Sequence, residues 1–407
     1  MRHSARHRMP TVRAAASRRL TRRWLAAAAL PAVLLLLGLL ITQHQKHHAP
    51  QNRISAPLSG HGSGSMPDRG TSTPSCAQQV DAMSVRDRLA QRLMVGIDPS
   101  DPDSAISVVR TTHVGGIFIG GTSTRILIGD YLRTLQEVAH IPVAVAVDDE
   151  GGRVQRINNL DGSIPSARTM AKSLSPEQVR QLAYKRGRAL RAHGITIDFA
   201  PVADVSDQPI NAVIGDRSFS PDPNTTTTYA GAYAAGLRDA GILPVLKHFP
   251  GHGRASGDSH RGAVTTPPLD ALRKIDLIPY QHLLNSGPTG VMVGHLNVPG
   301  LTNGMPASLS PASYQLLRTD LGFQGLAITD DLAAMHSITD RYDLPDAVLT
   351  ALHAGADMAL WISAQRLNEI LNRLNAAVQQ HQIPIADLDR AVQRILTVKG
   401  ICATSPQ

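Results

Sequence analysis

The sequence lacks the short motifs that identify several common classes of binding protein. It has neither a glycine fingerprint followed by a ribose-binding acid nor the lysine of a phosphate-binding loop, so nothing favours a nucleotide-binding fold. No acid completes a zincin pattern beside a pair of histidines. Only two cysteines are present, Cys76 and Cys402. We therefore expect neither a cofactor nor a bound metal.

Acidic residues are absent from residues 1–23, which contain eight arginines. The formal net charge of the whole chain is +8, so these arginines account for all of it and the remainder sums to zero. A nucleic-acid-binding protein carries its basic surface on the folded domain itself. The charge distribution therefore argues against a nucleic-acid partner.

An uncharged apolar run of 18 residues, 24–41, follows the arginines directly. This length is at the lower end of what spans a bilayer as a helix and exceeds the usual core of a signal peptide. Flanking arginines favour a cytoplasmic position for residues 1–23. No small-x-small cleavage site and no cysteine for lipid attachment come directly after the run. We predict an uncleaved single-pass signal anchor in the cell membrane with the remainder of the chain outside, and secretion after cleavage as the alternative.

Residues 42–75 are rich in serine, glycine, proline and histidine, and they show almost no apolar periodicity. Such a segment buries too little apolar surface to offset its loss of conformational entropy, so we predict a disordered linker. Residues 76–407 are then expected to form a single catalytic domain.

Short apolar runs alternate with helical patterns throughout this domain, which indicates a parallel sheet covered by helices on both faces. The expected strands are residues 116–119, 143–147, 195–200, 245–248, 290–294, 326–329 and 358–361. The expected helices are residues 126–139, 176–192, 227–240, 268–284, 311–321, 347–354, 365–380 and 385–398. Seven or eight such units predict an α/β fold of the TIM-type (β/α)8 barrel class, with a doubly wound sheet as the alternative.

Polar residues follow the carboxyl ends of three predicted strands, at Asp148, at Lys247-His248 and at Asp330-Asp331. Active sites of (β/α)8 barrels lie at this end of the strands. One such carboxylate could simply cap a helix, but three clusters on separate strands favour an active site.

The sequence KHFPGHG at residues 247–253 is followed by Asp258-Ser259-His260. Its proline and glycines predict a loop, so His248 and His252, although four residues apart, are not aligned on a helix as metal ligands. An acid two residues from a histidine orients the ring and favours its use as an acid and base near neutral pH. A satisfied surface pair of Asp258 and His260 is the alternative.

Four motifs in order resemble glycoside hydrolase family 3, in its single-barrel β-N-acetylglucosaminidase branch. They are DDEGGRVQR at residues 148–156, IGDRSF at 214–219, KHFPGHG with the downstream DSH, and ITDDL at 328–332 with Met335. The first motif departs from the family pattern because Asp149 replaces the usual glutamine. The position lies beside the sugar-contact residues, so the substitution is expected to alter local charge and leave the assignment intact.

The resemblance implies a retaining exo-β-N-acetylglucosaminidase that removes terminal N-acetylglucosamine from cell-wall saccharides derived from peptidoglycan. It implies that Asp330 is the nucleophile, that His260 is the acid/base catalyst and that Asp258 is the partner of His260. Retaining glycosidases use such a pair, usually two carboxylates. The residues implied to hold the sugar are Asp148, Arg156, Arg217, Lys247 and His248. A monomer is expected.

Three other functions remain open. Phosphorolysis is one, because a histidine acid/base avoids the repulsion between a carboxylate and phosphate. The second is a sugar-binding barrel without activity, which the retention of Asp330, Asp258 and His260 argues against. The third is a broad β-glucosidase, which resembles two-domain enzymes, whereas here only one helix follows the expected barrel.

The two cysteines lie before the first and after the last helix of the catalytic domain. The first and last elements of a closed barrel are neighbours, and export places both thiols in an oxidising compartment. We predict a disulfide between Cys76 and Cys402, with two unpaired thiols as the alternative.

Overall fold

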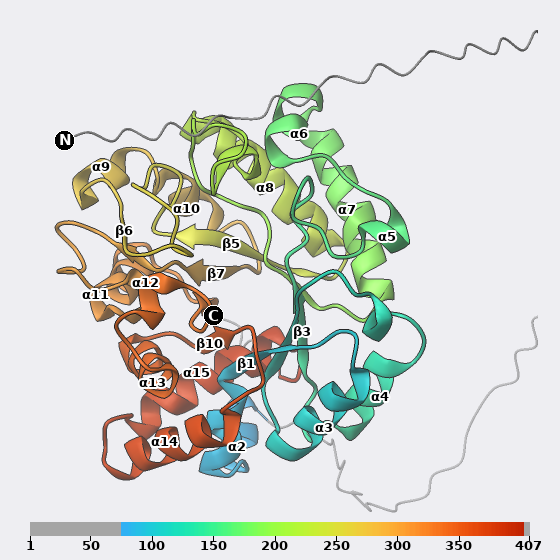
Figure 1. The fold of residues 1–407 in the computed structure, drawn as a ribbon, viewed down its shortest axis with the longest axis vertical. Coiled ribbons are helices and arrows are strands. Elements are labelled where there is room, and N and C mark those ends of the chain that lie inside the picture. Colours follow the sequence, from blue (N-terminus) through green and yellow to red (C-terminus); the bar gives the residue numbers. More distant parts are fainter. Residues whose placement is uncertain (1–74, 403–407) are drawn as a thin grey trace, which may run out of the picture. The chain divides into compact units, whose positions relative to one another are not determined.

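A computed structural model describes residues 75–402, and those residues form a closed parallel barrel (Figure 1). Eight strands of this part of the chain make up the barrel, in the spatial order β1-β10-β9-β7-β5-β4-β3-β2, and every adjacent pair is parallel. They are β1 (Leu93–Ile97), β2 (Gly116–Ile119), β3 (Ala144–Val147), β4 (Ile197–Asp198), β5 (Leu243–Phe249), β7 (Gly290–Val293), β9 (Leu326–Asp331) and β10 (Met358–Trp361). The predicted TIM-type barrel is confirmed.

Helices surround the strands on the outside of the barrel (Figure 1). The longer ones are α3 (Pro102–Thr112), α4 (Tyr131–Val138), α7 (Pro176–Ala192), α8 (Pro223–Asp239), α13 (Leu344–Ala354), α14 (Leu367–Gln379) and α15 (Ile385–Val398). The shorter ones are α1 (Cys76–Asp81), α2 (Val85–Gln91), α5 (Asn158–Asp161), α6 (Ala167–Ser173), α9 (Leu269–Lys274), α10 (Ile278–Leu283), α11 (Pro311–Gln315) and α12 (His336–Thr339). The loops after β5 and β7 add a small parallel ladder of β6 (Val264–Thr265) and β8 (Leu296–Asn297).

Strand β3 shows how the sequence divides the core into two layers. Ala144 and Ala146 point into the barrel, where they join a cluster with Phe118 and Phe199, whereas Val145 and Val147 join the outer cluster under the helices. Side chains of a strand alternate between its two faces, and both faces of a barrel strand are buried. An apolar run without alternation is therefore the expected pattern.

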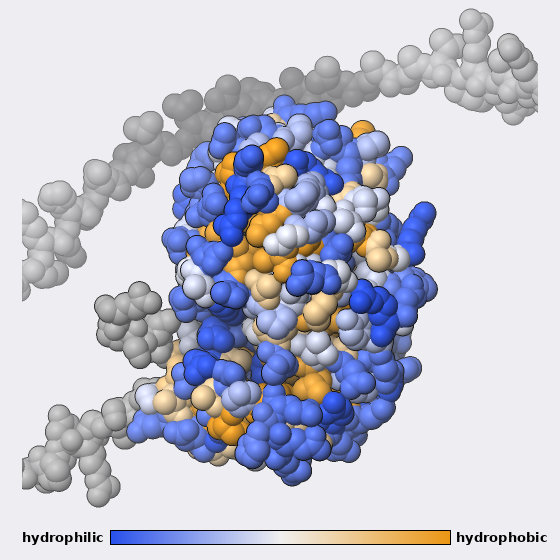
Figure 2. Space-filling view, turned by 90° about the vertical axis from the view of Figure 1, so that its left-hand side faces the viewer, coloured by the Kyte–Doolittle hydropathy of each residue, from blue (hydrophilic) through white to orange (hydrophobic). Residues whose placement is uncertain are grey.

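The face shown in Figure 2 is mostly polar, with apolar residues in smaller patches.

Helices α7 and α8 illustrate the local sequence signals. Ser175 caps α7 by accepting a hydrogen bond from the backbone N–H of Gln178, whose side chain bonds back to the Ser175 N–H. The two helices approach closely at Gly236, where a Cβ would lie only 2.2 Å from the carbonyl oxygen of Arg180. A glycine is required there because any side chain would force the helices apart.

The sequence prediction differed from the structure in several elements. Strand β1 was not predicted. It follows α2 after a single residue, Arg92, and no proline or glycine in the sequence separates the two elements. Helix 126–139 is a 3-10 turn (Arg125–Leu127) and α4, separated at Gly129 with φ of 74°. Residues 268–284 form α9 and α10, and residues 311–321 end in a π-turn (Leu316–Asp320).

The predicted basic tail (1–23), signal anchor (24–41) and almost all of the linker (42–75) lie outside the described residues. Within residues 75–402, none of the helices has the length and apolar character needed to cross a membrane.

The predicted disulfide is present, with the Cα atoms of Cys76 and Cys402 5.2 Å apart. It joins α1 to the segment after α15, and these helices pack together although the cysteines are 326 residues apart in sequence. The bond therefore closes the barrel domain across nearly its whole length.

We expect the double variant Cys76→Ser/Cys402→Ser to lose about 4–5 kcal/mol of unfolding free energy, because the bond restricts the unfolded chain. Denaturant unfolding of the variant and of the reduced wild type would measure this loss, which should be similar in both. Alkylation of the unfolded, unreduced protein should label neither cysteine. Labelling of both thiols would contradict the bond.

Candidate active site

A cavity of about 520 Å³ opens at the carboxyl end of the barrel strands. Its lining includes seven of the eight predicted site residues, namely Asp148, Arg156, Arg217, Lys247, His248, His260 and Asp330. The eighth, Asp258, is hydrogen-bonded to His260. The structure thus brings together side chains from β5, β9 and the loops after β3, β4 and β5.

Asp330 lies near the end of β9 and is only 9% exposed. Its Oδ1 accepts a hydrogen bond of 2.9 Å from the backbone N–H of Asp331. Burial alone would raise the pKa of Asp330, but the nearby rings of His248 and His295 hold it below its usual value. The carboxylate is therefore ionised at neutral pH and able to act as a nucleophile.

The neighbouring Asp331 has a different environment. Its Oδ1 accepts hydrogen bonds from the backbone N–H groups of Ala333 and Ile362, at 2.9 and 3.1 Å. Burial and the charge of Asp330 raise its pKa to about 6. These contacts indicate that Asp331 fixes the loops beside the pocket and that Asp330 is the carboxylate available for chemistry.

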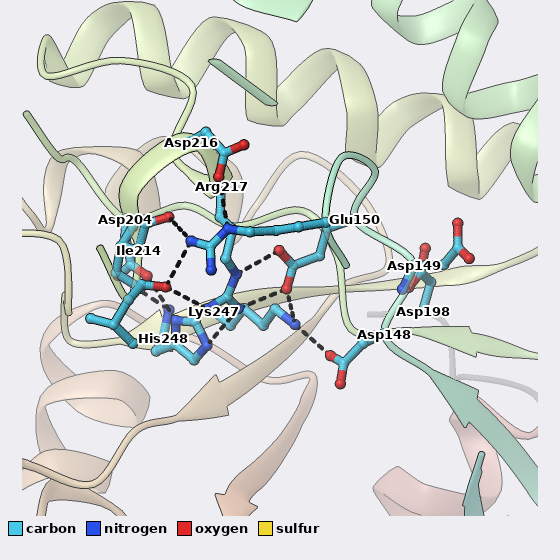
Figure 3. Close-up of polar contacts among 12 residues, drawn as sticks. Asp148, Asp149, Glu150, Asp198, Asp204, Ile214, Asp216, Arg217, Lys247 and His248 are labelled. Atoms are coloured by element: carbon cyan, nitrogen blue, oxygen red, sulfur yellow. Dashed lines mark hydrogen bonds and ion pairs between the residues drawn. The ribbon is translucent and has the colours of Figure 1, made fainter. Parts of the chain in front are cut away.

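Lys247 is the centre of a buried ion-pair network that is drawn in Figure 3. Its Nζ lies 2.5 Å from Asp148 Oδ1 and 2.6 Å from Glu150 Oε1. Arg217 binds the same Glu150 through two hydrogen bonds, from Nη2 at 2.7 Å and from Nε at 2.8 Å. Burial alone would raise the pKa of Glu150, but Arg217 and Lys247 hold it well below its usual value. The network fixes four charged groups along one wall of the cavity.

His248 is held by Asp204, a buried residue that the sequence reasoning missed. Its Nδ1 lies 2.7 Å from Asp204 Oδ2, and Oδ1 of the same carboxylate accepts the backbone N–H of His252 at 2.7 Å. Arg217 Nη2 lies 3.4 Å from His248 Nε2. Since an arginine only donates, the contacts assign the proton to Nδ1 and leave Nε2 as an acceptor facing the cavity.

Arg156 lies at the cavity wall with its Nη2 3.8 Å from Asp148 Oδ2. Its Nε atom is buried and has no hydrogen-bond partner in the described part of the chain. The guanidinium as a whole lines the cavity and is partly exposed, so it is suited to donate a hydrogen bond to an oxygen of a ligand.

Asp258 and His260 form the predicted pair, with Asp258 Oδ1 2.8 Å from His260 Nδ1. The His260 side chain is 56% exposed and lines the cavity from the loop after β5. Burial raises the pKa of Asp258, but its hydrogen bonds to His260 outweigh that effect and lower it. The carboxylate therefore orients the ring and leaves Nε2 free to exchange a proton with a substrate.

Asp149, the residue that departs from the family pattern, points away from the cavity (Figure 3). It is fully buried and pairs with Arg186, whose Nε lies 2.6 Å from Asp149 Oδ1. Its Oδ2 accepts the backbone N–H groups of Arg156 and Ile157, at 2.7 and 3.2 Å. Burial and the charge of Asp149 raise the pKa of the adjacent Asp198 well above its usual value. Asp149 therefore lies outside the cavity lining and holds the backbone of the loop that carries Arg156.

We expect Arg186→Met to destabilise the protein by about 3–5 kcal/mol, because it leaves the Asp149 charge buried without a partner. A matched control is Arg180→Met on the same helix, α7, which removes an exposed ion pair with Asp239 of α8. That change should cost less than about 1 kcal/mol. Denaturant unfolding measures both values, and equal small losses would contradict a structural role for the buried pair.

Sequence reasoning also missed Glu150 and His295 as site residues. Glu150 lies two positions after Asp148 in the first motif. Its ion pair with Arg217 was not predicted, because the two residues are 67 positions apart in the chain. His295 is buried beside Asp330, where its Nδ1 lies 2.7 Å from Ser308 Oγ and its Nε2 lies 2.8 Å from the carbonyl oxygen of Asp331. Nothing in its local sequence marks it.

A metal site at His248 and His252 finds no support in the geometry. Their rings lie 5.8 Å apart at an angle of 69°, and His248 is already bound to Asp204. Across residues 75–402, no three His, Cys, Asp or Glu side chains are grouped so that they could hold a metal ion.

Comparison with known proteins gives a consistent result. Residues 84–398 match the family described as "Glycosyl hydrolase family 3 N terminal domain". The chain is 52% identical over 336 residues to "Beta-hexosaminidase LpqI" of Mycobacterium tuberculosis, which covers 80% of this chain and 86% of that protein. A solved structure of a glycosyl hydrolase of the GH3 family from Mycobacterium smegmatis matches with a TM-score of 0.77 and 51% identity, over 78% of this chain and 98% of the other. A glycoside hydrolase family 3 β-N-acetylglucosaminidase from Paenibacillus sp. matches with a TM-score of 0.73 and 30% identity, over 80% and 65% of the two chains.

Proposed function

The chain belongs to glycoside hydrolase family 3 as a β-N-acetylhexosaminidase, and we propose that it removes terminal β-linked N-acetylglucosamine with retention of anomeric configuration. The observation that best supports this proposal is the ionised Asp330 in one cavity with His260, a histidine oriented by a carboxylate. A nucleophile and a proton donor are the two groups that retaining hydrolysis requires.

In the first step, His260 donates its Nε2 proton to the glycosidic oxygen while Asp330 attacks the anomeric carbon. The carbon–oxygen bond to the leaving group breaks, and a covalent glycosyl ester forms on Asp330. In the second step, neutral His260 takes a proton from water, the hydroxide attacks the anomeric carbon, and the Asp330 carboxylate is released. Two inversions at the anomeric carbon restore the β-configuration.

The charged wall of the cavity supplies the contacts that hold the sugar. Lys247, Arg217 and Arg156 are donors, and Asp148 accepts hydrogen bonds from hydroxyl groups. Their mutual ion pairs fix them before the substrate arrives, so little ordering is required on binding. The barrel interior is filled by a cluster that includes Phe118, Phe199 and Met292, which closes the floor of the cavity. A cavity of about 520 Å³ with a closed floor can accommodate a terminal sugar, which supports exo cleavage.

Hydrolysis of 4-nitrophenyl N-acetyl-β-glucosaminide by the purified full-length chain tests the proposal. We expect release of β-N-acetylglucosamine, observed by NMR before mutarotation, with the same rate in the presence and absence of phosphate. Formation of a sugar 1-phosphate would identify a phosphorylase instead. Binding of N-acetylglucosamine without turnover would identify a sugar-binding barrel.

We also propose that the enzyme acts on peptidoglycan-derived saccharides outside the cytoplasmic membrane, anchored by residues 24–41. The apolar run and the eight preceding arginines support this location. Fractionation of expressing cells should place the full-length chain in the membrane pellet, and external protease should cleave the barrel domain from spheroplasts. Recovery of a shortened chain in the medium would indicate cleavage and secretion instead.

A further inference from the structure

We propose that the leaving group of the substrate binds to an apolar shelf at the rim of the active site, formed by Ile97, Pro99, Ala334, Met335 and Ile362. The enzyme then prefers leaving groups that present an apolar face beside the glycosidic oxygen. The inference rests on the proposed glycosidase function and adds the chemical class of the leaving group.

The order of the strands separates a polar and an apolar sector of the rim. Asp148 follows β3, and Lys247 and His248 belong to β5, so β3, β4 and β5 form one continuous polar side. The shelf residues Ile97 and Pro99 lie at the end of β1, and Ile362 follows β10, which is the neighbour of β1. The sugar hydroxyls require the charged side, so the apolar side is left for the part of the substrate with fewer polar groups.

The exposure of Ile362 is imposed by the fold. Ile362 is 49% exposed to solvent, and it lines the cavity. The backbone is held by the hydrogen bond from its N–H to Asp331 Oδ1 at 3.1 Å. On the other side it contacts Gly96, where a Cβ would lie 2.2 Å from the Ile362 carbonyl carbon. Ile362 is therefore fixed next to the carboxyl end of β9, which carries Asp330.

The shelf also contacts the loop that carries the proton donor. Ser259 Oγ donates a hydrogen bond of 3.5 Å to Met335 Sδ, and the backbone N–H of Ser337 donates to the Ser259 carbonyl at 3.2 Å. His260 is the next residue in the chain. Because His260 protonates the glycosidic oxygen, the group attached to that oxygen lies on the same side of the cavity as Met335.

The methyl and 2-phenylethyl glycosides of N-acetyl-β-glucosamine test the shelf. Both leaving groups are primary alcohols of similar leaving ability, and they differ mainly in apolar area. Burial of a phenyl group against the shelf should raise kcat/KM for the 2-phenylethyl glycoside about tenfold over the methyl glycoside. The Ile362→Ser variant should lose most of this preference and keep its activity on the methyl glycoside.

A matched control is Ile385→Ser, which removes an isoleucine of similar exposure (43%) on α15, outside the cavity lining. It should leave the preference intact. Equal kcat/KM for the two glycosides in the wild type would overturn the shelf while leaving the glycosidase function in place. Equal losses on both glycosides in Ile362→Ser would assign this residue to binding of the sugar or its N-acetyl group and would also overturn the proposal. Absence of turnover on any N-acetylglucosaminide would instead contradict the proposed function itself.

Discussion

Replacement of Asp330 by asparagine should reduce kcat/KM on the order of 10⁴-fold or more, because the variant retains the shape of the site and lacks the nucleophile. The pKa of Asp330 is lowered by nearby histidines, so the wild-type group is charged and needs no activating base. Steady-state assays on 4-nitrophenyl N-acetyl-β-glucosaminide would measure the loss. The fold should be unaffected, as judged by its unfolding midpoint.

Trapping of the intermediate identifies the nucleophile directly. A slow 5-fluoro N-acetylglucosaminyl donor should leave one sugar on the enzyme, and fragmentation of the labelled peptide should locate it on Asp330. The adjacent Asp331→Asn variant is the matched control, since it should still be labelled. A label on Asp331, or none in the wild type, would contradict the assignment.

The fold class followed from the sequence because parallel barrel strands are buried on both faces and therefore read as short apolar runs. Strand β1 was not predicted, because it begins at Leu93, only two residues after the last residue of α2. Residues 195–200 contain four apolar residues together with Thr196 and Asp198, yet only Ile197 and Asp198 belong to β4. The apolar residues predict that the segment is buried. They do not predict which residues form the strand, because a strand is defined by hydrogen bonds to its neighbours in the barrel.

The contact between two site residues was predicted where one short motif contains both of them. Asp258 and His260 are two positions apart, and their hydrogen bond was anticipated from that spacing. By contrast, the residue that holds His248 is Asp204, which is 44 positions earlier and lies in a segment without a recognisable pattern. Such long-range partners become visible only when the barrel brings the ends of β4 and β5 together.

The directions in which the buried acidic side chains of the site point were also not predictable from the sequence. The sequence indicated that Asp149 would alter local charge, but the direction of its side chain depends on Arg186 from α7. The same backbone turn sends Asp148 and Glu150 toward Lys247 and sends Asp149 behind the cavity wall. Adjacent acids in one motif thus have separate tasks, which only the three-dimensional arrangement distinguishes.

Replacement of His260 by alanine should have an effect that depends on the leaving group. With a natural disaccharide, loss of the general acid should lower kcat/KM by ~10²–10⁴-fold. With a 2,4-dinitrophenyl glycoside the loss should be small, because this leaving group departs without a proton. The ratio kcat/KM is the appropriate measure, since it reports the steps up to formation of the glycosyl-enzyme.

The second half of the reaction provides an independent test of the same histidine. Without His260 no base activates water, so the glycosyl-enzyme should accumulate and kcat on the activated substrate should fall. Azide, a nucleophile that requires no base, should restore kcat and yield the β-glycosyl azide. The matched control is His336→Ala, because His336 is 60% exposed and pairs with Asp340 at 2.9 Å, outside the cavity lining. It should change neither the leaving-group dependence nor the response to azide. Equal losses on both substrates in His260→Ala, without rescue by azide, would mean that His260 binds the sugar or supports its loop and transfers no proton.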